Sequence, residues 1–175
     1  MPFTPFHFGP GLFLKSLGSR YFSFLSFVAT QVVIDCETLY FIMRRDYPVH
    51  RTLHTFVGAT IAGFITSLAL IASRTVVCKI SSRFDNPPTE PWPVFRSESS
   101  TIGILIGGII GGASHPFLDG IMHPDVRPFA PWSENNPLLT MIGIGTLHVG
   151  CILSGMVGLL LLLFASMVYH KNHAG

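Results

Sequence analysis

This chain is poor in charged residues: Asp, Glu, Lys and Arg make up only 11% of its 175 residues, while hydrophobic residues make up 49%. This balance argues against a soluble domain with an ordinarily charged surface. The few basic residues are dispersed, so the sequence carries no signature of nucleic-acid binding. An integral membrane protein is the expected class.

Cysteine is also scarce. Cys36, Cys78 and Cys151 are odd in number and lie in three different hydrophobic stretches, which predicts no disulfide framework. We expect them to be small buried residues. The N-terminal MPFTPFHFGPGLFLK has no basic residue before its apolar run, and prolines and glycines interrupt it. It is therefore expected to be an ordered entry segment or a short interfacial helix and not a cleavable signal peptide.

Four long hydrophobic stretches are present. A bilayer core about 30 Å thick requires roughly 20 apolar residues per helix, and each stretch meets or approaches that length. The sequence predicts an all-α integral membrane bundle of about four transmembrane helices with a short N-terminal entry segment, all in a single membrane domain. The predicted spans cover about 21–43, 55–80, 101–122 and 138–169, with a Pro- and Ser-rich connector at 81–100.

The basic residues are unevenly divided between the two sides of this bundle. With four spans, both termini share one side with the 81–100 connector, and that side carries seven Lys and Arg residues against four on the other. The bias predicts an integral protein of the cell (inner) membrane with both termini in the cytoplasm.

Ionisable side chains, which are costly inside a membrane, cluster near the face opposite the two termini. Asp35 lies eight residues before the end of its predicted span at Met43, and His115 lies eight residues before His123, so each is about 12 Å inside the membrane. His50 and His54 come just before the second span begins. Ionisable residues that cluster inside a membrane mark a functional site, so we expect one at this face.

One stretch contributes several of these groups. GGASHPFLDGIMHPD places His115, Asp119 and His123 four residues apart, which puts them on one face of a helix. Pro116 predicts either a kink there or a new helix that begins at the proline. In both cases Asp119 and His123 stay aligned.

A metal site is the simplest account of the polar cluster. His50 and His54 are also four residues apart, which predicts one helical face. Imidazole and carboxylate ligands suit zinc, manganese or iron. For Asp35, His50, His54, His115 and Asp119 taken together, the alternative is a proton relay in which the five groups satisfy one another.

Three other residues keep two interpretations each. His148 is a ligand or a buried structural histidine, Glu37 ligates or pairs with Arg44 or Arg45, and Asp125 ligates or begins a turn. The glycines of 103–112 repeat at intervals of four, the small-residue spacing that lets helices approach closely in lipid. The third span is therefore expected to be central in the bundle.

The order of motifs resembles the YdjM-like family of predicted membrane-bound metal-dependent hydrolases. The motifs are the His in PFHFGPGLF, the acidic pair in VVIDCETLY, the His pair in VHRTLHTF, and GGASHPFLDGIMHPDVRPFAPW. They span roughly residues 1–132, and the S-H-x-x-x-D element followed by Pro and Trp is the most specific. Glu37 stands where the family usually has Asp, and His123 where it has Thr.

The resemblance also implies a ligand set. The H-x-x-x-D element is similar to that of zinc-dependent phospholipase C and the P1-type nucleases, which cleave phosphate esters with a cluster of zinc ions. It implies that Asp35, His54, His115 and Asp119 hold one metal and that His7 with Asp119 contributes to a second. One to three ions are implied, zinc first, with manganese or iron as alternatives.

The leading hypothesis is a membrane-embedded metal-dependent hydrolase of a phosphate ester such as a lipid. Its metal would lower the pKa of water to roughly 7 and polarise the phosphoryl oxygen. Asp35 or Glu37 would orient that water or accept its proton. Arg51 would stabilise phosphate charge or merely extend to the membrane interface. The predicted ligands are His7, Asp35, His50, His54, His115, Asp119 and His123, and the predicted catalytic residues are Asp35, Glu37 and Arg51.

A second hypothesis comes from a different class of protein. A divalent-cation or proton transporter would use the same His/Asp cluster as a transient site, with access from both faces and often an inverted repeat. The sequence shows no repeat, and its polar groups gather at one end of the bundle, which favours the enzyme. A metal-stabilised membrane protein that mainly binds a partner is a third possibility. Lipid bilayer and a lipid or phosphate-ester substrate are the expected partners, and no nucleic acid is expected.

Overall fold

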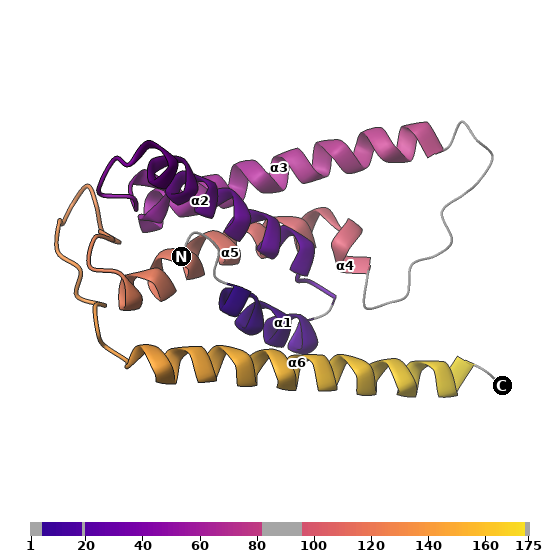
Figure 1. Ribbon diagram of the computed structural model, residues 1–175. Coiled ribbons are helices and arrows are strands. Elements are labelled where there is room, and N and C mark those ends of the chain that lie inside the picture. Colours follow the sequence, from indigo (N-terminus) through magenta and orange to yellow (C-terminus); the bar gives the residue numbers. More distant parts are fainter. Residues whose placement is uncertain (1–4, 19, 82–95, 174–175) are drawn as a thin grey trace.

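The computed structural model describes residues 5–18, 20–81 and 96–173, and these residues form helices with no strand among them. Four helices are long: α2 (Phe24–Arg44), α3 (Phe56–Ser81), α5 (Thr101–Met122) and α6 (Ile144–His173). Four are short: η1 (Pro5–His7), α1 (Phe8–Leu17), η2 (Thr52–His54) and α4 (Arg96–Ser99). The predicted all-α architecture with a short N-terminal helix is confirmed (Figure 1).

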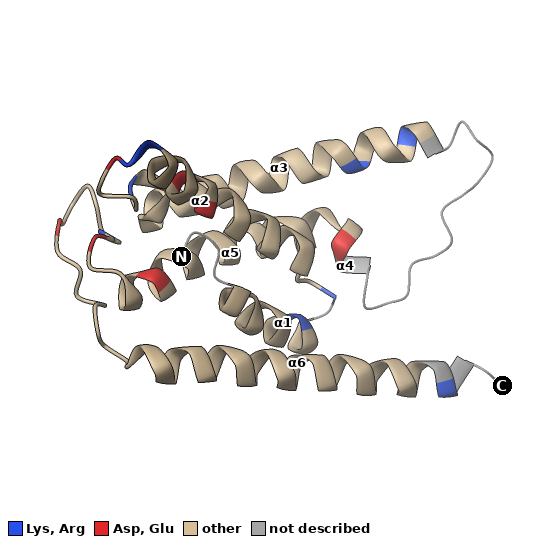
Figure 2. Cartoon of the chain, viewed as in Figure 1, with Lys and Arg blue, Asp and Glu red and all other residues tan. Residues whose placement is uncertain are grey.

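All four long helices are long and apolar enough to cross a membrane. Figure 2 shows that their middle portions are almost free of Lys, Arg, Asp and Glu, and that charged residues lie mostly near the helix ends and in the loops. This distribution fits membrane embedding, because charge within the hydrocarbon core is costly. The cytoplasmic location of the termini stays a prediction, as does the assignment of the chain to one domain.

The boundaries of three long helices lie within three residues of the predicted spans, but the last span was placed too early. α6 begins at Ile144 and not at residue 138. The preceding loop is tied to the end of α5: the Thr140 N–H donates to the Ile121 carbonyl over 3.1 Å, and Asn136 Nδ2 donates to the Gly120 carbonyl over 2.8 Å. Thr140 also has a positive φ of 60°, which a continuing helix does not allow.

α5 is the central helix, packed against both α2 and α3. Its glycines allow the backbones to touch. A Cβ at Gly112 would lie 2.2 Å from the Ala59 carbonyl oxygen of α3, and one at Gly107 would lie 2.2 Å from the Ser23 carbonyl oxygen at the start of α2. The prediction that small residues make this span central is confirmed.

α6 is held mainly by α1, which lies between α6 and the rest of the bundle (Figure 1). Glycines permit this contact too: a Cβ at Gly9 would lie 1.9 Å from the Cys151 carbonyl oxygen. Cys151 is buried here, whereas Cys36 and Cys78 are exposed, so the expectation of three buried cysteines was wrong for two of them. Both exposed cysteines lie on outer faces of long helices, where a membrane protein presents apolar side chains to lipid.

The helix directions alternate, so one end of the bundle collects the ends of several elements. The C-terminal ends of α2 and α5 and the N-terminal ends of α3 and α6 lie together, at the left of Figure 1. The C-terminal end of α3 and the short helix α4 lie at the opposite end (Figure 1), and most of the predicted connector at 81–100 lies outside the described residues. The predicted polar face of the bundle is therefore a real assembly of helix ends.

Candidate metal centre

Four buried side chains meet at this end of the bundle. Asp35 comes from α2, His54 from η2, and His115 and Asp119 from adjacent turns of α5. Each offers one ligand atom, and these atoms all lie within 4.8 Å of one another. His54 and His115 are completely buried, and Asp35 and Asp119 are nearly so. We call these four residues the inner group; they could hold a metal ion.

The spacing of these atoms fits a shared metal ion better than it fits hydrogen bonds between the side chains. His115 Nε2 lies 3.5 Å from Asp35 Oδ1 and 3.3 Å from Asp119 Oδ2, and His54 Nε2 lies 3.5 Å from Asp119 Oδ2. Nitrogen and oxygen ligands bind zinc at roughly 2.1 Å, so two ligands of one tetrahedral ion lie about 3.4 Å apart. Within the described part of the chain, His115 Nε2 and Asp119 Oδ1 are buried without a hydrogen-bond partner, which is costly unless another group binds them.

Neighbouring side chains hold both imidazole rings in orientation. His54 Nδ1 lies 3.1 Å from Glu37 Oε2, and His115 Nδ1 contacts Gln31 Oε1. The Gln31 amide is itself fixed, because its Nε2 donates to the Gly111 carbonyl and to Ser114 Oγ, each over 3.2 Å. A proton on Nδ1 leaves the Nε2 lone pair for an ion, the arrangement usual for metal-binding histidines. The Thr38 hydroxyl also lies 3.2 Å from His54 Nε2.

His7 joins the inner group from the N-terminal segment. Its Nε2 lies 3.4 Å from Asp119 Oδ1, whereas His54 and His115 contact the other carboxylate oxygen, Oδ2. Both ring nitrogens of His7 are buried without a hydrogen-bond partner among the described residues. Burial lowers the pKa of His7 to about 4, so its ring is neutral and able to ligate at neutral pH.

A second group lies beside the first. His50, His123 and Asp125 can also place ligand atoms within 4.8 Å of one another; we call them the outer group. The His50 and His123 rings are stacked with centroids 4.5 Å apart, and the His50 and His54 rings are 4.7 Å apart. Burial is the main cause that lowers the pKa of both His50 and His123, so both rings are neutral at pH 7.

Two local predictions were wrong in detail. His50 and His54 do not share a helical face, because α3 begins only at Phe56 and His54 ends the short helix η2. Glu37 explains why α3 begins only at Phe56. Its carboxylate accepts hydrogen bonds from the backbone N–H groups of Arg51 and Leu53, which hold the chain in a turn before the helix.

The predicted stripe on α5 is also shorter than expected. α5 continues through Pro116 as one helix and ends at Met122, so neither a new helix at the proline nor an aligned His123 is observed. His123 has extended backbone angles and caps the helix through its N–H bond to the Asp119 carbonyl. Its ring therefore joins His50, while Asp119 stays with the inner group.

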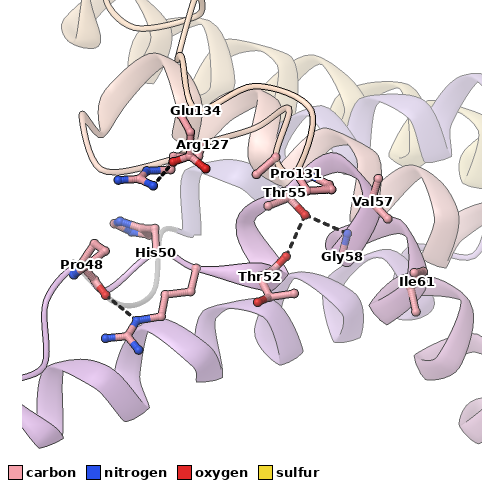
Figure 3. Close-up of a pocket in the computed structure, with 12 residues that line it drawn as sticks. Pro48, His50, Thr52, Thr55, Val57, Gly58, Ile61, Arg127, Pro131 and Glu134 are labelled. Carbon is pink, nitrogen blue, oxygen red and sulfur yellow. Dashed lines mark hydrogen bonds and ion pairs between the residues drawn. The ribbon is translucent and has the colours of Figure 1, made fainter.

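A pocket of about 510 Å³ adjoins His50 between the start of α3 and the loop 127–134 (Figure 3). Its lining includes Val57, Ile61 and two arginines, Arg51 and Arg127. Arg51 Nη2 lies 2.7 Å from Asp46 Oδ1, and Arg127 pairs with Glu134. The pocket thus offers both apolar surface and guanidinium groups beside the outer group.

Of the remaining candidates, Glu37 lies at the site and His148 lies outside it. Glu37 lies beside His54 and not beside Arg44 or Arg45, and the His148 ring stacks on Phe6 at 4.6 Å between centroids. Sequence reasoning missed Gln31, although it lies four residues before Asp35. That spacing on a helix puts both on one face, so a polar side chain there was a usable signal.

Comparisons with protein-family models, with curated proteins and with solved structures found no match to this chain. The structure by itself shows a four-helix, membrane-like protein with a buried His/Asp cluster.

Proposed function

We propose that this chain is a membrane-embedded, metal-dependent hydrolase of a phosphate ester, with a lipid as the substrate class. The observation that carries the proposal is the inner group: buried imidazole and carboxylate atoms 3.3–3.5 Å apart, with His115 Nε2 and Asp119 Oδ1 lacking a hydrogen-bond partner among the described residues. The motif resemblance to the YdjM-like family agrees with this chemistry.

The donor set fits a divalent ion. The ligands of this ion would be Asp35, His54, His115 and Asp119. The His7 ring would lie beside the second oxygen of Asp119. Two imidazoles and two carboxylates suit zinc first, and manganese or iron next. Such an ion lowers the pKa of water to about 7 and polarises a phosphoryl oxygen.

The chain's own residues divide the remaining work. Glu37 receives hydrogen bonds from two backbone N–H groups and lies beside His54 Nδ1, which supports a positioning role for it. Asp35 is then the better candidate to orient a water or accept its proton. Arg51 lines the pocket and would bind phosphate oxygens, since a guanidinium forms paired hydrogen bonds with them.

The pocket supports a lipid phosphate as the substrate. Arg51 and Arg127 are each paired with an exposed carboxylate, Asp46 and Glu134, and exposed ion pairs are weak. A phosphate can therefore replace these carboxylates at little cost. Val57 and Ile61 supply apolar surface on the same pocket, which suits the beginning of an acyl chain.

Metal analysis of detergent-purified protein tests the premise. Wild type supplied with zinc or manganese is expected to retain at least one ion per chain, and Asp119→Asn is expected to retain at least one ion fewer than wild type. Asp46→Asn, an exposed carboxylate outside both groups, serves as the control and should retain the wild-type metal content.

Turnover assays then test the reaction class. Wild type is expected to hydrolyse at least one member of a panel of phosphodiesters and phosphomonoesters, and not amides, with loss of activity in Asp119→Asn. Wild type that holds metal but hydrolyses nothing would point to transport or a structural role. Folded wild type that binds no zinc, manganese or iron would contradict the whole proposal.

A further inference from the structure

The inner group has little room for a substrate. All four of its members are buried, and an ion that also held the activated water would have no position left for a substrate oxygen. Zinc sites that bind a substrate directly have three protein ligands and leave a position open. A phosphate ester that enters from the pockets meets His50 first.

The outer group has the features that the inner group lacks. His123 and Asp125 are only half-buried, and together with His50 they line a pocket of about 560 Å³. His50 and Pro48 also line the neighbouring pocket that contains the two arginines. The outer group therefore lies where two pockets meet.

Its members are held in place by contacts within the fold. Asp125 Oδ2 lies 2.9 Å from His50 Nδ1 and accepts the backbone N–H groups of Val49 and His50 over 3.3 Å. The His123 ring stacks on His50, and its backbone is fixed as the cap of α5. These contacts bring two imidazoles and a carboxylate to one point without using any residue of the inner group.

We propose that His50, His123 and Asp125 form a second metal site, which binds a first-row divalent ion with a coordination position open to the pockets. Two histidines and one carboxylate suit zinc or iron. On this assignment, which rests on the proposed hydrolase function for its role, the outer ion receives a phosphate oxygen of the substrate. The inner ion would supply the activated water.

Cobalt(II) provides a test that does not depend on turnover. The full chain is purified in detergent, stripped with a chelator and reloaded, and bound cobalt per chain and the visible spectrum are recorded. His123→Ala and Asp125→Asn are expected to bind one ion fewer than wild type and to retain the inner ion. Asp119→Asn is expected to lose the inner ion. His148→Ala, a histidine outside both groups, is the matched control and should bind as much as wild type.

Inorganic phosphate distinguishes the two sites. Added phosphate is expected to change the cobalt spectrum of wild type and of His148→Ala, but not that of His123→Ala. Undiminished cobalt in both outer variants would overturn the proposal, and so would a wild-type spectrum that phosphate does not alter, whether or not the variants fold. If Asp119→Asn alone kept all its cobalt, the inner site and the proposed function would fail while the outer site stood.

Discussion

At the scale of single residues, neighbouring side chains fix the orientation of the imidazole rings. His54 and His115 lie in different elements, yet each has an acceptor at Nδ1 and turns Nε2 toward Asp119. The acceptors, Glu37 and Gln31, both come from α2. α2 therefore fixes the tautomer of two rings that it does not itself carry, which is how ligand basicity and direction are usually set.

Replacing Glu37 tests this arrangement. Glu37→Gln removes the negative charge beside His54 Nδ1 and should weaken metal binding at the inner group by about 10- to 100-fold. A competition titration against a chelator of known zinc affinity measures the change. Asp46→Asn removes an exposed carboxylate nearby and should leave the affinity unchanged. Equal affinity in wild type and Glu37→Gln would mean that His54 does not bind the ion.

Much of the inner group could be predicted from sequence, because the spacing of His115 and Asp119 and the cost of ionisable residues in lipid are visible there. The partition into two groups could not. It depends on where α5 ends, since a helix one turn longer would align His123 with Asp119. It also depends on the turn that Glu37 organises before α3, which no local pattern around His50 and His54 reveals.

At the scale of helices, close backbone contact fixes the position of α5. A methyl group at Gly112 would meet the carbonyl oxygen of Ala59 at 2.2 Å and its carbon at 2.8 Å. Both are backbone atoms, so no side chain can rotate away and the helices must separate. Polar contacts support the same packing: Ser67 Oγ on α3 donates to the Ile104 carbonyl on α5 over 3.1 Å, a contact that stabilises helix association in lipid.

Gly112→Ala is therefore expected to destabilise the fold by about 1–3 kcal/mol, as overpacking of a tight contact does. Gly150→Ala is the matched control, because a methyl group at Gly150 on α6 would meet nothing within 4 Å. Alanine is favoured over glycine in helices by about 1 kcal/mol, so this variant should be as stable as wild type or more so. Thermal unfolding in detergent measures both. Similar unfolding temperatures for the two variants would contradict the close contact of α3 and α5.

The helices themselves were well predicted because span length and apolar composition are properties of the chain alone. Residues 138–143 were assigned wrongly to the last span for the opposite reason. Their composition is compatible with a helix, but Thr140 forms a hydrogen bond with Ile121 at the end of α5. That contact is tertiary, so hydrophobic length could not reveal it.

At the scale of the whole molecule, the two ends of the bundle are built differently. One end contains the metal-binding candidates. At the other end, an ion pair 2.7 Å long joins Lys15 of α1 to Glu98 of α4. Glu98 also accepts Ser23 Oγ and the N–H groups of Phe24 and Leu25 at the start of α2, where the helix dipole favours a negative charge. This carboxylate thus connects three helices at the end of the bundle far from the site.

The pH dependence of stability should reveal that connection. Burial alone would raise the pKa of Glu98, but hydrogen bonds from Lys15, Ser23 and the Leu25 N–H outweigh it and hold the pKa below its ordinary 4.5. A carboxyl group whose pKa is lowered on folding stabilises the fold above its unfolded pKa, and this contribution is lost as the pH falls through the folded pKa. Glu98→Gln should therefore lower the unfolding temperature at pH 7, and the difference from wild type should shrink as the pH falls below about 4.5. Glu134→Gln, at an exposed ion pair, should change little at any pH. A difference between wild type and Glu98→Gln that stays constant with pH would show that the charge of Glu98 does not join these helices.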